Sequence, residues 1–289
     1  MGGPMIRSIL LALAETPGDA SAKNYAFWLA RKEGSHVHAV AIIDITAFEV
    51  PMIGTPDGFM PSVVPHSFRE SQSLIDEMNI RCRERLDQFA DQCDSRGLSC
   101  STETKTGIPS EIISQSAVAH DIVVVSRTGY NPAANTKETI DSLVAPVIRS
   151  SVRPVLVAGT DFQEESEVSN ILVAYDGSSH SVRALLVAAE LAARPNTNCT
   201  LVTVVPSEDT GWEILAPAES FLAHHGVVPQ KRVEVSSKPS LVISGLVASG
   251  NVDLLIMGAY GHSPIREVLF GSTTERILSH CSVNVILQS

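Results

Sequence analysis

Short apolar runs recur along the chain, separated by longer segments of mixed polarity. With the residues that end them, they cover 9–15, 37–43, 121–125, 154–158, 171–177, 199–205, 253–257 and 283–287. Apolar runs this short, bounded by polar residues or glycine, are typical of strands buried on both faces of a parallel sheet. We therefore expect a core of parallel strands.

The runs fall into two sets with the same order of elements, which indicates an internal repeat. In each set the opening run leads to an alanine-rich helical segment, residues 20–32 in the first copy and 179–193 in the second. Pro109 and Pro239 then mark the start of a later helix in each copy, since proline is favoured in the first helical turn. Strands that alternate with helices predict a parallel, doubly wound sheet with right-handed crossovers.

The repeat divides the chain into two domains. The first is expected at residues 1–159 and the second at 169–289, and the chain of 289 residues is long enough for both. The segment 160–168 carries several acidic residues and predicts a polar linker.

The first copy carries a long additional segment, roughly 46–97, between its second and third strands. Its first part, 47–65, is apolar and broken by proline and glycine, which fits either packing against the partner domain or an exposed interaction surface. Residues 67–92 predict a long amphipathic helix with Leu74, Met78, Leu86 and Phe89 among its apolar positions. The second copy offers only 213–225 for a helix here, and His224-His225 is too small a pair to indicate a metal site.

Composition narrows the class of protein. Hydrophobic residues make up 44% and charged residues 18%, as in globular proteins. The net charge of −11 argues against a nucleic-acid or anionic-membrane partner. Five cysteines without a C-x-x-C pair, no secretory leader and no apolar run long enough to span a bilayer lead us to expect a cytoplasmic protein with reduced thiols.

The stretch 253–274, DLLIMGAYGHSPIREVLFGSTT, carries the clearest functional pattern. A predicted strand leads into Gly258 and Gly261, and Gly271 precedes a run of Ser and Thr at the start of a predicted helix. Glycine lets backbone N–H groups approach a ligand, and a helix start attracts anions. The spacing fits neither the P-loop nor the dinucleotide fingerprint, and for the first two glycines alone an ordinary strand-to-helix turn is an equal alternative.

The complete pattern G-x2-G-x9-G-S, from Gly258 to Ser272, resembles the ATP-binding signature of the universal stress protein family. The order of elements is similar to that family over nearly the whole chain. The resemblance implies an α/β fold of two tandem Rossmann-like (adenine nucleotide alpha hydrolase-like) domains. Each would be a five-stranded parallel sheet with helices on both faces, and the two would associate through their last strands as a pseudo-twofold pair.

The same resemblance implies a nucleotide site in the second domain. The carboxylate of Asp176 would contact the adenosine, the backbone around Val204 would meet the edge of the adenine, and Ala174 would lie beside them. Met257 and Gly258 would flank base and ribose. The phosphates would lie on Gly261, His262, Gly271, Ser272, Thr273 and Thr274. For Asp176 a role in capping the following helix remains an alternative.

The first copy lacks this pattern at the corresponding positions. Ala14 stands at the position of Asp176 and Ser126 at that of Gly258, although Gly129 matches Gly261. Asp141 lies where the phosphates would be, and a carboxylate there would repel them. We therefore expect one nucleotide site per chain.

Three classes of function follow. The first is a stress-response or signalling protein that binds ATP, AMP or another adenine nucleotide, with Mg²⁺ possible on the phosphates and an unidentified protein as partner. The second is a slow ATP hydrolase, and the third a tandem scaffold or carrier that binds an apolar ligand or partner through the 46–65 loop. The first is favoured because no catalytic residue accompanies the phosphate loop. Whether two chains form a homodimer stays open.

Overall fold

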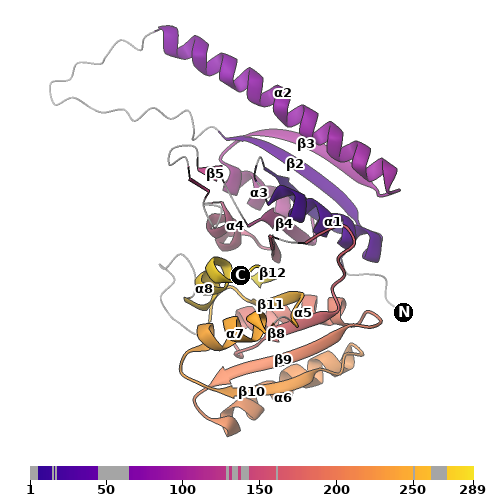
Figure 1. Ribbon diagram of the computed structural model, residues 1–289, viewed down its shortest axis with the longest axis vertical. Helices are drawn as coiled ribbons and strands as arrows, with labels where there is room; N and C mark the ends of the chain where they lie inside the picture. Colours follow the sequence, from indigo (N-terminus) through magenta and orange to yellow (C-terminus); the bar gives the residue numbers. More distant parts are fainter. Residues whose placement is uncertain are drawn as a thin grey trace, which may run out of the picture.

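The structure is a computed structural model (Figure 1). It describes residues 6–14, 16, 18–44, 65–127, 130–131, 136–137, 143–160, 162–249, 251–261 and 272–289, and for 65–72, 74, 130–131, 136–137 and 272 only the backbone. The apolar segment 47–64, Gly129 and Asp141 therefore lie outside the described residues.

Strands and helices alternate in both halves of the chain. The first half contains β1 (Ser8–Leu13), α1 (Asp19–Glu33), β2 (His36–Asp44), α2 (Pro65–Ser95), β3 (Cys100–Gly107), α3 (Pro109–Ala117), β4 (Ile122–Ser126), α4 (Val144–Ser150) and β7 (Val155–Ala158). Between β4 and α4, the short strands β5 (Tyr130–Asn131) and β6 (Thr136–Lys137) form a separate two-stranded sheet. The second half contains β8 (Asn170–Ala174), α5 (Ser179–Ala192), β9 (Asn198–Val205), α6 (Glu208–His224), β10 (Gln230–Val235), α7 (Pro239–Ala248), β11 (Leu254–Gly258), α8 (Ser272–His280) and β12 (Asn284–Gln288).

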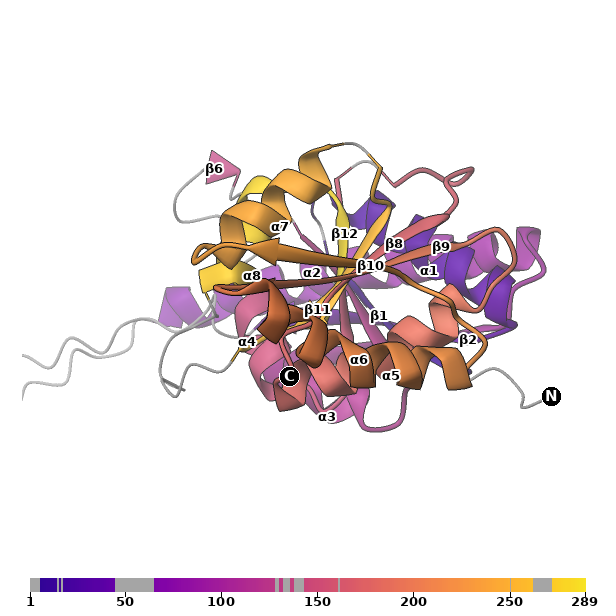
Figure 2. The ribbon, with the colours of Figure 1, turned by 90° about the horizontal axis from the view of Figure 1, so that it is seen from below.

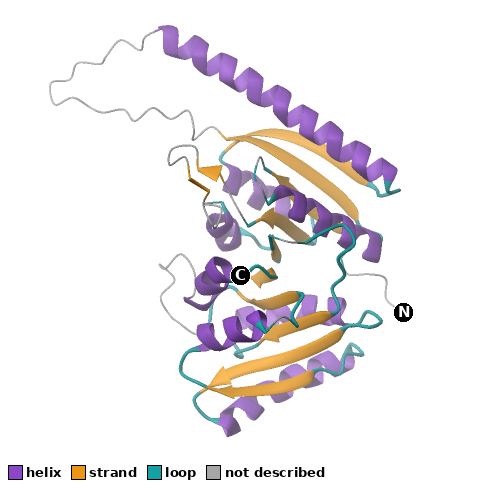
Figure 3. Ribbon diagram, viewed as in Figure 1, coloured by secondary structure: helices purple, strands orange, loops and turns teal. Residues whose placement is uncertain are grey.

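The main strands form one ten-stranded sheet of order β10-β9-β8-β11-β12-β7-β4-β1-β2-β3. Each half contributes five parallel strands, and the last strands of the halves, β7 and β12, pair antiparallel at the centre. Strand order is therefore the same in both halves when each is followed from the centre outward, which relates them by a pseudo-twofold axis (Figure 3). The predicted tandem fold is confirmed.

Helices cover both faces of this sheet. Figure 2 shows α5 and α6 on one side of the strands of the second half and α7 and α8 on the other. One buried core joins α1, α2, α5 and α6 to the sheet, and a second joins α3, α4, α7 and α8 to its opposite face. Strands such as Ile122–Ser126 are buried throughout because each of their faces is covered by a core.

The edge strands β3 and β10 have the sequences CSTETKTG and QKRVEV, with mostly half-buried or exposed residues. Neither contains an apolar run, so the hydrophobic pattern did not locate them. They are strands because each pairs in register with the fully formed strand beside it, β2 or β9.

Helix α2 occupies the place between the second and third strands that α6 occupies in the second half. Its described apolar side chains Cys82, Leu86, Phe89 and Cys93 are buried on the sheet. They recur at the spacing of one helical face, as the amphipathic pattern predicted. Helix α6 begins at Glu208, five residues before the predicted start at Glu213.

The linker between the halves is more than a polar connector. Phe162 is 6% exposed, with its ring centroid 4.6 Å from that of Tyr25. Glu164 accepts hydrogen bonds from Arg96 Nε and Nη2, each at 2.8 Å. Trp28 Nε1 donates to Glu167 at 2.9 Å. Glu167 is therefore attached to α1 and Glu164 to the residue that follows α2. The burial of Phe162 was not predicted.

Candidate nucleotide site

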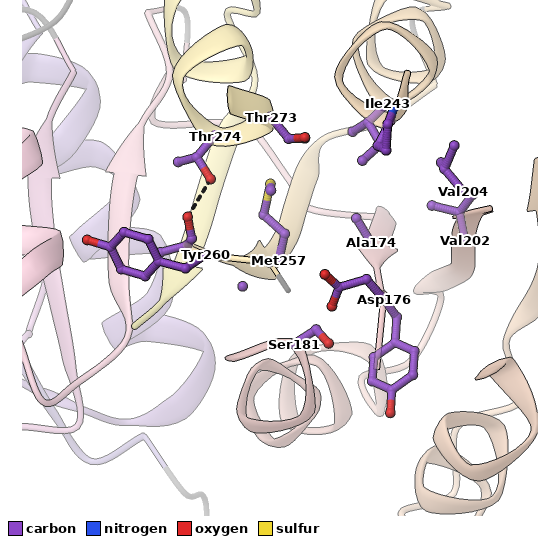
Figure 4. A pocket seen from close by; sticks show the side chains of 15 residues that line it. Ala174, Asp176, Ser181, Val202, Val204, Ile243, Met257, Tyr260, Thr273 and Thr274 are labelled. Carbon is purple, nitrogen blue, oxygen red and sulfur yellow. Dashed lines mark hydrogen bonds between the residues drawn. The ribbon is translucent and has the colours of Figure 1, made fainter. Parts of the chain in front are cut away.

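A cavity of about 280 Å³ lies at the carboxyl ends of β8, β9 and β11 (Figure 4). The chain leaves β8 for β9 on one side and later returns to β11 on the other, so strand order reverses between β8 and β11. Open α/β sheets bind ligands in the crevice at such a switch point.

The structure brings the predicted residues together in this cavity. Ala174, Val204, Met257 and Gly258 line it from the strand ends. Asp176 and Gly261 line it from the loops that follow, and Thr273 and Thr274 from the start of α8. His262 and Gly271 lie outside the described residues, as does the side chain of Ser272, the first residue of α8.

The carboxylate of Asp176 is directed into the cavity (Figure 4). Its Oδ1 accepts a hydrogen bond from the backbone N–H of Ser178 at 3.0 Å. Ser178, and not Asp176, is the N-cap of α5, since its side chain accepts from the backbone N–H of Ser181. The helix therefore does not need Asp176 as its cap.

Strand β9 continues past the end of β8, whose last pair is Ala174 with Val202. The N–H of Tyr175 donates to Val202 O at 2.9 Å. Backbone groups of alternate residues in a strand point to the same side. The N–H and C=O of Val204 therefore point beyond β8 toward the cavity, as the predicted contact with the edge of a base requires.

Gly258 has a packing role that the sequence did not reveal. A methyl group at this position would lie 2.8 Å from the backbone nitrogen of Ser181 and 2.8 Å from Cβ of His180. The end of β11 thus packs directly on the first turn of α5. A methyl group on Gly261 would lie 3.1 Å from Asp176 Oδ2, so the loop after β11 passes close to that carboxylate.

Thr274 is buried, and its hydroxyl donates to the carbonyl oxygen of Ala259 at 2.8 Å. This bond fixes the loop after β11 to the first turn of α8 (Figure 4). The Thr274 hydroxyl hydrogen is thus already engaged. The group that Thr274 can offer to an anion is its backbone N–H, as for other residues in the first turn of a helix.

Several residues that line the cavity were not predicted. Val202, Pro239 and Ile243 add apolar walls, and Ser181 and Tyr260 lie at its rim. Val202 could have been predicted from Val204, because side chains two residues apart in a strand lie on the same face. The apolar pattern of α7 does not show which of its side chains faces a ligand. The ring of Tyr260 is directed away from the cavity (Figure 4), with its centroid 5.4 Å from that of His180.

The described lining includes one ionisable carboxyl group, that of Asp176, and no Lys, Arg or His. Burial, followed by the adjacent Asp176 carboxylate, raises the pKa of the Tyr175 phenol. Within the described residues, no group of three or more His, Cys, Asp or Glu could hold a metal ion.

The first half arranges the corresponding place differently. Ala14 follows β1, and its N–H donates to Asp19 Oδ1 at 3.1 Å. A carboxylate is therefore present after all, supplied by the first residue of α1, but it is buried and paired with Lys23 at 3.4 Å. Ser126, at the position of Gly258, is buried with its hydroxyl 2.9 Å from that of Thr16.

Comparison with known proteins agrees with this architecture. Residues 167–287 match the profile of the Universal stress protein family. Over nearly its whole length the chain is also similar to a universal stress protein of Synechocystis sp., with 24% identity covering 97% of this chain and 99% of that protein. The second half of the chain, which this profile matches, belongs to the universal stress protein family. The first half repeats the same fold, so the chain has a tandem architecture.

Solved structures of universal stress proteins share the fold. One from Archaeoglobus fulgidus has a TM-score of 0.74 at 20% identity and covers 98% of both chains. A putative universal stress protein from Pseudomonas aeruginosa has a TM-score of 0.62 at 16% identity, covering 98% of this chain and 93% of that one. In the described part of this protein, no helix is both long and apolar enough to cross a bilayer.

Proposed function

We propose that this universal stress protein binds one adenine nucleotide, ATP, in its second half and acts in stress response or signalling through that occupancy. The observation that carries the proposal is the cavity at the switch point, where the Asp176 carboxylate and the first turn of α8 line one space. The cavity would accept a ligand with a hydroxyl-bearing group at one end and an anion at the other.

The base and ribose fit the strand side of the cavity. The backbone of Val204 offers one donor and one acceptor to the edge of an adenine. Met257 and Ile243 supply apolar surface for the faces of the ring. Asp176 can accept hydrogen bonds from the ribose hydroxyls, since an ionised carboxylate has several acceptor positions.

The phosphates fit the other side, at the start of α8. The N–H groups of a first helical turn lack intrahelical partners and carry the positive end of the helix dipole. Gly261, His262, Gly271 and Ser272 belong to this side by sequence, and Thr273 lines it. Mg²⁺, where present, would be carried by the phosphates, because the described lining offers a single carboxylate.

Isothermal titration calorimetry with ATP, AMP and GTP tests the proposal. We expect one ATP per chain, because Ala14 has no carboxylate and Asp19 is engaged by Ala14 and Lys23. Asp176→Ala is expected to abolish binding while the variant stays folded, with a melting temperature lowered only by the loss of the bond to the Ser178 N–H. A stoichiometry of two, or full binding by Asp176→Ala, would contradict the proposal. At a hundredfold excess over Kd, ATP should stabilise the wild type by about 2.7 kcal/mol.

Slow hydrolysis is the alternative that uses the same site. A positioned general acid or base contributes roughly 10²- to 10⁴-fold to a rate, so a site without one is expected below about one turnover per minute. Single-turnover hydrolysis with protein in excess measures this rate. Faster turnover that Ser272→Ala or His262→Ala eliminates while ATP stays bound would identify an enzyme instead.

The cysteines fit a reducing compartment. Cys82, Cys93, Cys100, Cys199 and Cys281 are all free thiols. The proposal therefore includes a cytoplasmic location, where thiols stay reduced. Fractionation of the native source, followed by detection with an antibody against the full chain, tests that location.

A further inference from the structure

A second cavity, of about 240 Å³, lies where the two halves meet. Helix α5 forms one wall, and the amino ends of β4 and β7 form the other, with Gln288 at the end of β12 between them. Its lining includes Ile6, Val152, Arg153, Arg183, Leu186 and Val187. None of them belongs to the nucleotide cavity.

The lining combines exposed aliphatic surface with positive charge. Val152 is 65% exposed and Leu186 is 48% exposed, although both are large apolar side chains. Arg183 is exposed and Arg153 half-buried. Nε of Arg153 is buried without a hydrogen-bond partner among the described residues.

Among the described residues of the lining, Asp121 is the one acidic residue, and its carboxylate already accepts hydrogen bonds from the backbone. Its Oδ2 accepts the N–H of Arg7 at 2.8 Å and that of Ser8 at 3.0 Å. The two arginines therefore leave the cavity with a surplus of positive charge, although the chain as a whole carries −11. Such a surface favours an apolar group that is accompanied by a carboxylate.

The first half has the corresponding surface on α1. With β1 and β8 aligned on Ala12 and Ala174, the positions of Arg183, Leu186 and Val187 are taken by Ser21, Asn24 and Tyr25. The pKa of Tyr25 supports this alignment. Burial raises that pKa most, and the nearby carboxylate of Asp253 raises it further. Asp253 is the counterpart of Asp121, which shares the second cavity with Val187.

On α1 this surface is covered by the linker, which makes a turn at residues 164–165. The N–H of Phe162 donates to Ser21 Oγ at 3.1 Å, and Asn24 Nδ2 donates to Phe162 O at 3.2 Å. The Phe162 ring lies against Tyr25 and Trp28. Glu164, two residues later, forms an ion pair with Arg96. One half of the molecule thus shows how a peptide with an apolar anchor is held at this place in the fold, while its nearby carboxylate pairs with an arginine that follows α2.

We propose that the α5 cavity is a docking site for a short acidic peptide segment of a partner protein. One apolar side chain of the segment would enter the space between Leu186, Val187 and Val152. A neighbouring Asp or Glu would pair with Arg183 and Arg153, whose guanidinium groups can bind a carboxylate through two hydrogen bonds.

The docking site is linked to the nucleotide cavity through two contacts. Gln288, in the docking site, accepts the N–H of Ala259, in the nucleotide cavity, at 2.8 Å. Arg183 Nη2 donates to His180 Nδ1 at 2.9 Å, and the His180 ring packs edge-on against Tyr260. A carboxylate that draws Arg183 away from His180 would alter the packing of Tyr260. This link, unlike the docking itself, rests on the proposed nucleotide site.

Selection of random octapeptides displayed on phage, with the full chain immobilised and no nucleotide present, tests the docking. Enriched peptides are expected to share one large apolar residue within two positions of an Asp or Glu. Measured by fluorescence polarisation, they should bind Arg183→Glu and Leu186→Asp about tenfold or more weakly than the wild type. Both residues are exposed, so both variants should fold, which their melting temperatures would verify. Val235→Asp, at an exposed position (59%) on the far edge strand β10, is the matched control and should bind normally.

Three outcomes would overturn the docking proposal. The first is that no such consensus emerges, or that both variants bind as the wild type does. The second is that octanoate displaces the peptides with equal affinity, which would identify a site for small amphipathic acids. The third is that sedimentation shows a dimer that Leu186→Asp dissociates, since the cavity would then hold a second copy of the chain.

The link is tested separately by repeating the peptide titration with saturating ATP. Peptide affinity is expected to change at least about twofold for the wild type and not for Asp176→Ala, a difference that reports a coupling free energy between the sites. Unchanged affinity in protein that calorimetry shows to be ATP-bound would overturn the link and leave the docking intact. Failure of ATP to bind would refute the nucleotide proposal, and with it the link, while the nucleotide-free selection still decides the docking.

Discussion

The hydroxyl of Thr274 donates to the carbonyl oxygen of Ala259, 2.8 Å away, and joins the start of α8 to the loop that leaves β11. Both residues line the proposed nucleotide cavity, and both are buried. The start of α8 and the loop after β11 are therefore held together by a hydrogen bond that forms without a ligand. A preformed site of this kind binds with little ordering cost.

Thr274→Val removes that bond while keeping the shape of the side chain. The Ala259 carbonyl loses its Thr274 donor in a buried place, which is expected to lower the free energy of unfolding by about 1–3 kcal/mol. Thr274→Ser keeps the hydroxyl and should lose much less. Urea unfolding of both variants measures the difference. Equal stability of the Val and Ser variants would mean that the bond contributes nothing.

Gly258→Ala places a methyl group 2.8 Å from the backbone of α5. Because backbone atoms on both sides must shift, we expect a loss of about 1–3 kcal/mol, as for other overpacked sites. Gly245→Ala in α7 is the matched control, since a methyl group there meets no atom within 4 Å. In a helix that substitution should stabilise by about 0.4–1 kcal/mol. Thermal unfolding of both variants provides the test, and a neutral Gly258→Ala would refute the packing role.

Arg127 connects the first half to α8 of the second. It is 3% exposed, and it donates to Leu278 O at 3.5 Å and to Val283 O. Burial lowers the pKa of its guanidinium to about 10, so it remains charged at neutral pH. Arg127→Ala should lower stability by about 1–3 kcal/mol, because both carbonyls lose a donor. It should also weaken ATP binding, since the opposite end of α8 lines the cavity.

The control for this prediction is Arg232→Ala. The Arg232 side chain is 53% exposed and pairs with Glu234 on the surface, so its loss should change stability by less than about 0.5 kcal/mol. Urea unfolding gives the stabilities and calorimetry the affinities. If Arg127→Ala behaves like Arg232→Ala, the junction does not depend on the buried guanidinium.

Asp19 should make stability depend on pH. Burial raises the pKa of its carboxyl, and this outweighs the opposing effects of Lys23 and the Ala14 N–H. A carboxyl with a folded-state pKa above its unfolded value of 3.8 favours the folded state most below that value, and this contribution is lost as pH rises through the folded pKa. Asp19→Asn, whose Oδ1 can still accept from Ala14, should therefore be more stable than the wild type at pH 7.

Unfolding free energies of wild type and Asp19→Asn across this range measure the effect, and the advantage of the variant should shrink toward acid pH. Asp91→Asn, at an exposed position on α2, serves as the control and should show no such trend. Destabilisation of Asp19→Asn at neutral pH would mean that the ion pair with Lys23 stabilises the folded state by more than burial of the Asp19 charge destabilises it.

The elements that are buried on both faces could be predicted from the sequence. Strands such as β4 and β11 are continuous apolar runs, and Pro109 and Pro239 mark the first turns of α3 and α7 as predicted. Both signals are local in the sequence, because an apolar run and a proline in a first helical turn each involve only a few adjacent residues. The repeat then followed from their order, and the ends of the predicted strands indicated where a site would form.

Features that depend on a partner distant in sequence could not be predicted from the sequence, because the fold brings the partners together. Strands β3 and β10 have no apolar pattern and exist because a neighbouring backbone pairs with them. Phe162 is buried because α1 offers Ser21 and Asn24 to its backbone. The fold also places the Asp19 carboxylate beside Ala14 in the first half. It likewise places the Thr274 hydroxyl against the carbonyl oxygen of Ala259. A hydrogen bond requires a particular distance and direction between donor and acceptor. For groups far apart in the sequence, these are defined only once the sheet has fixed the positions of the two groups.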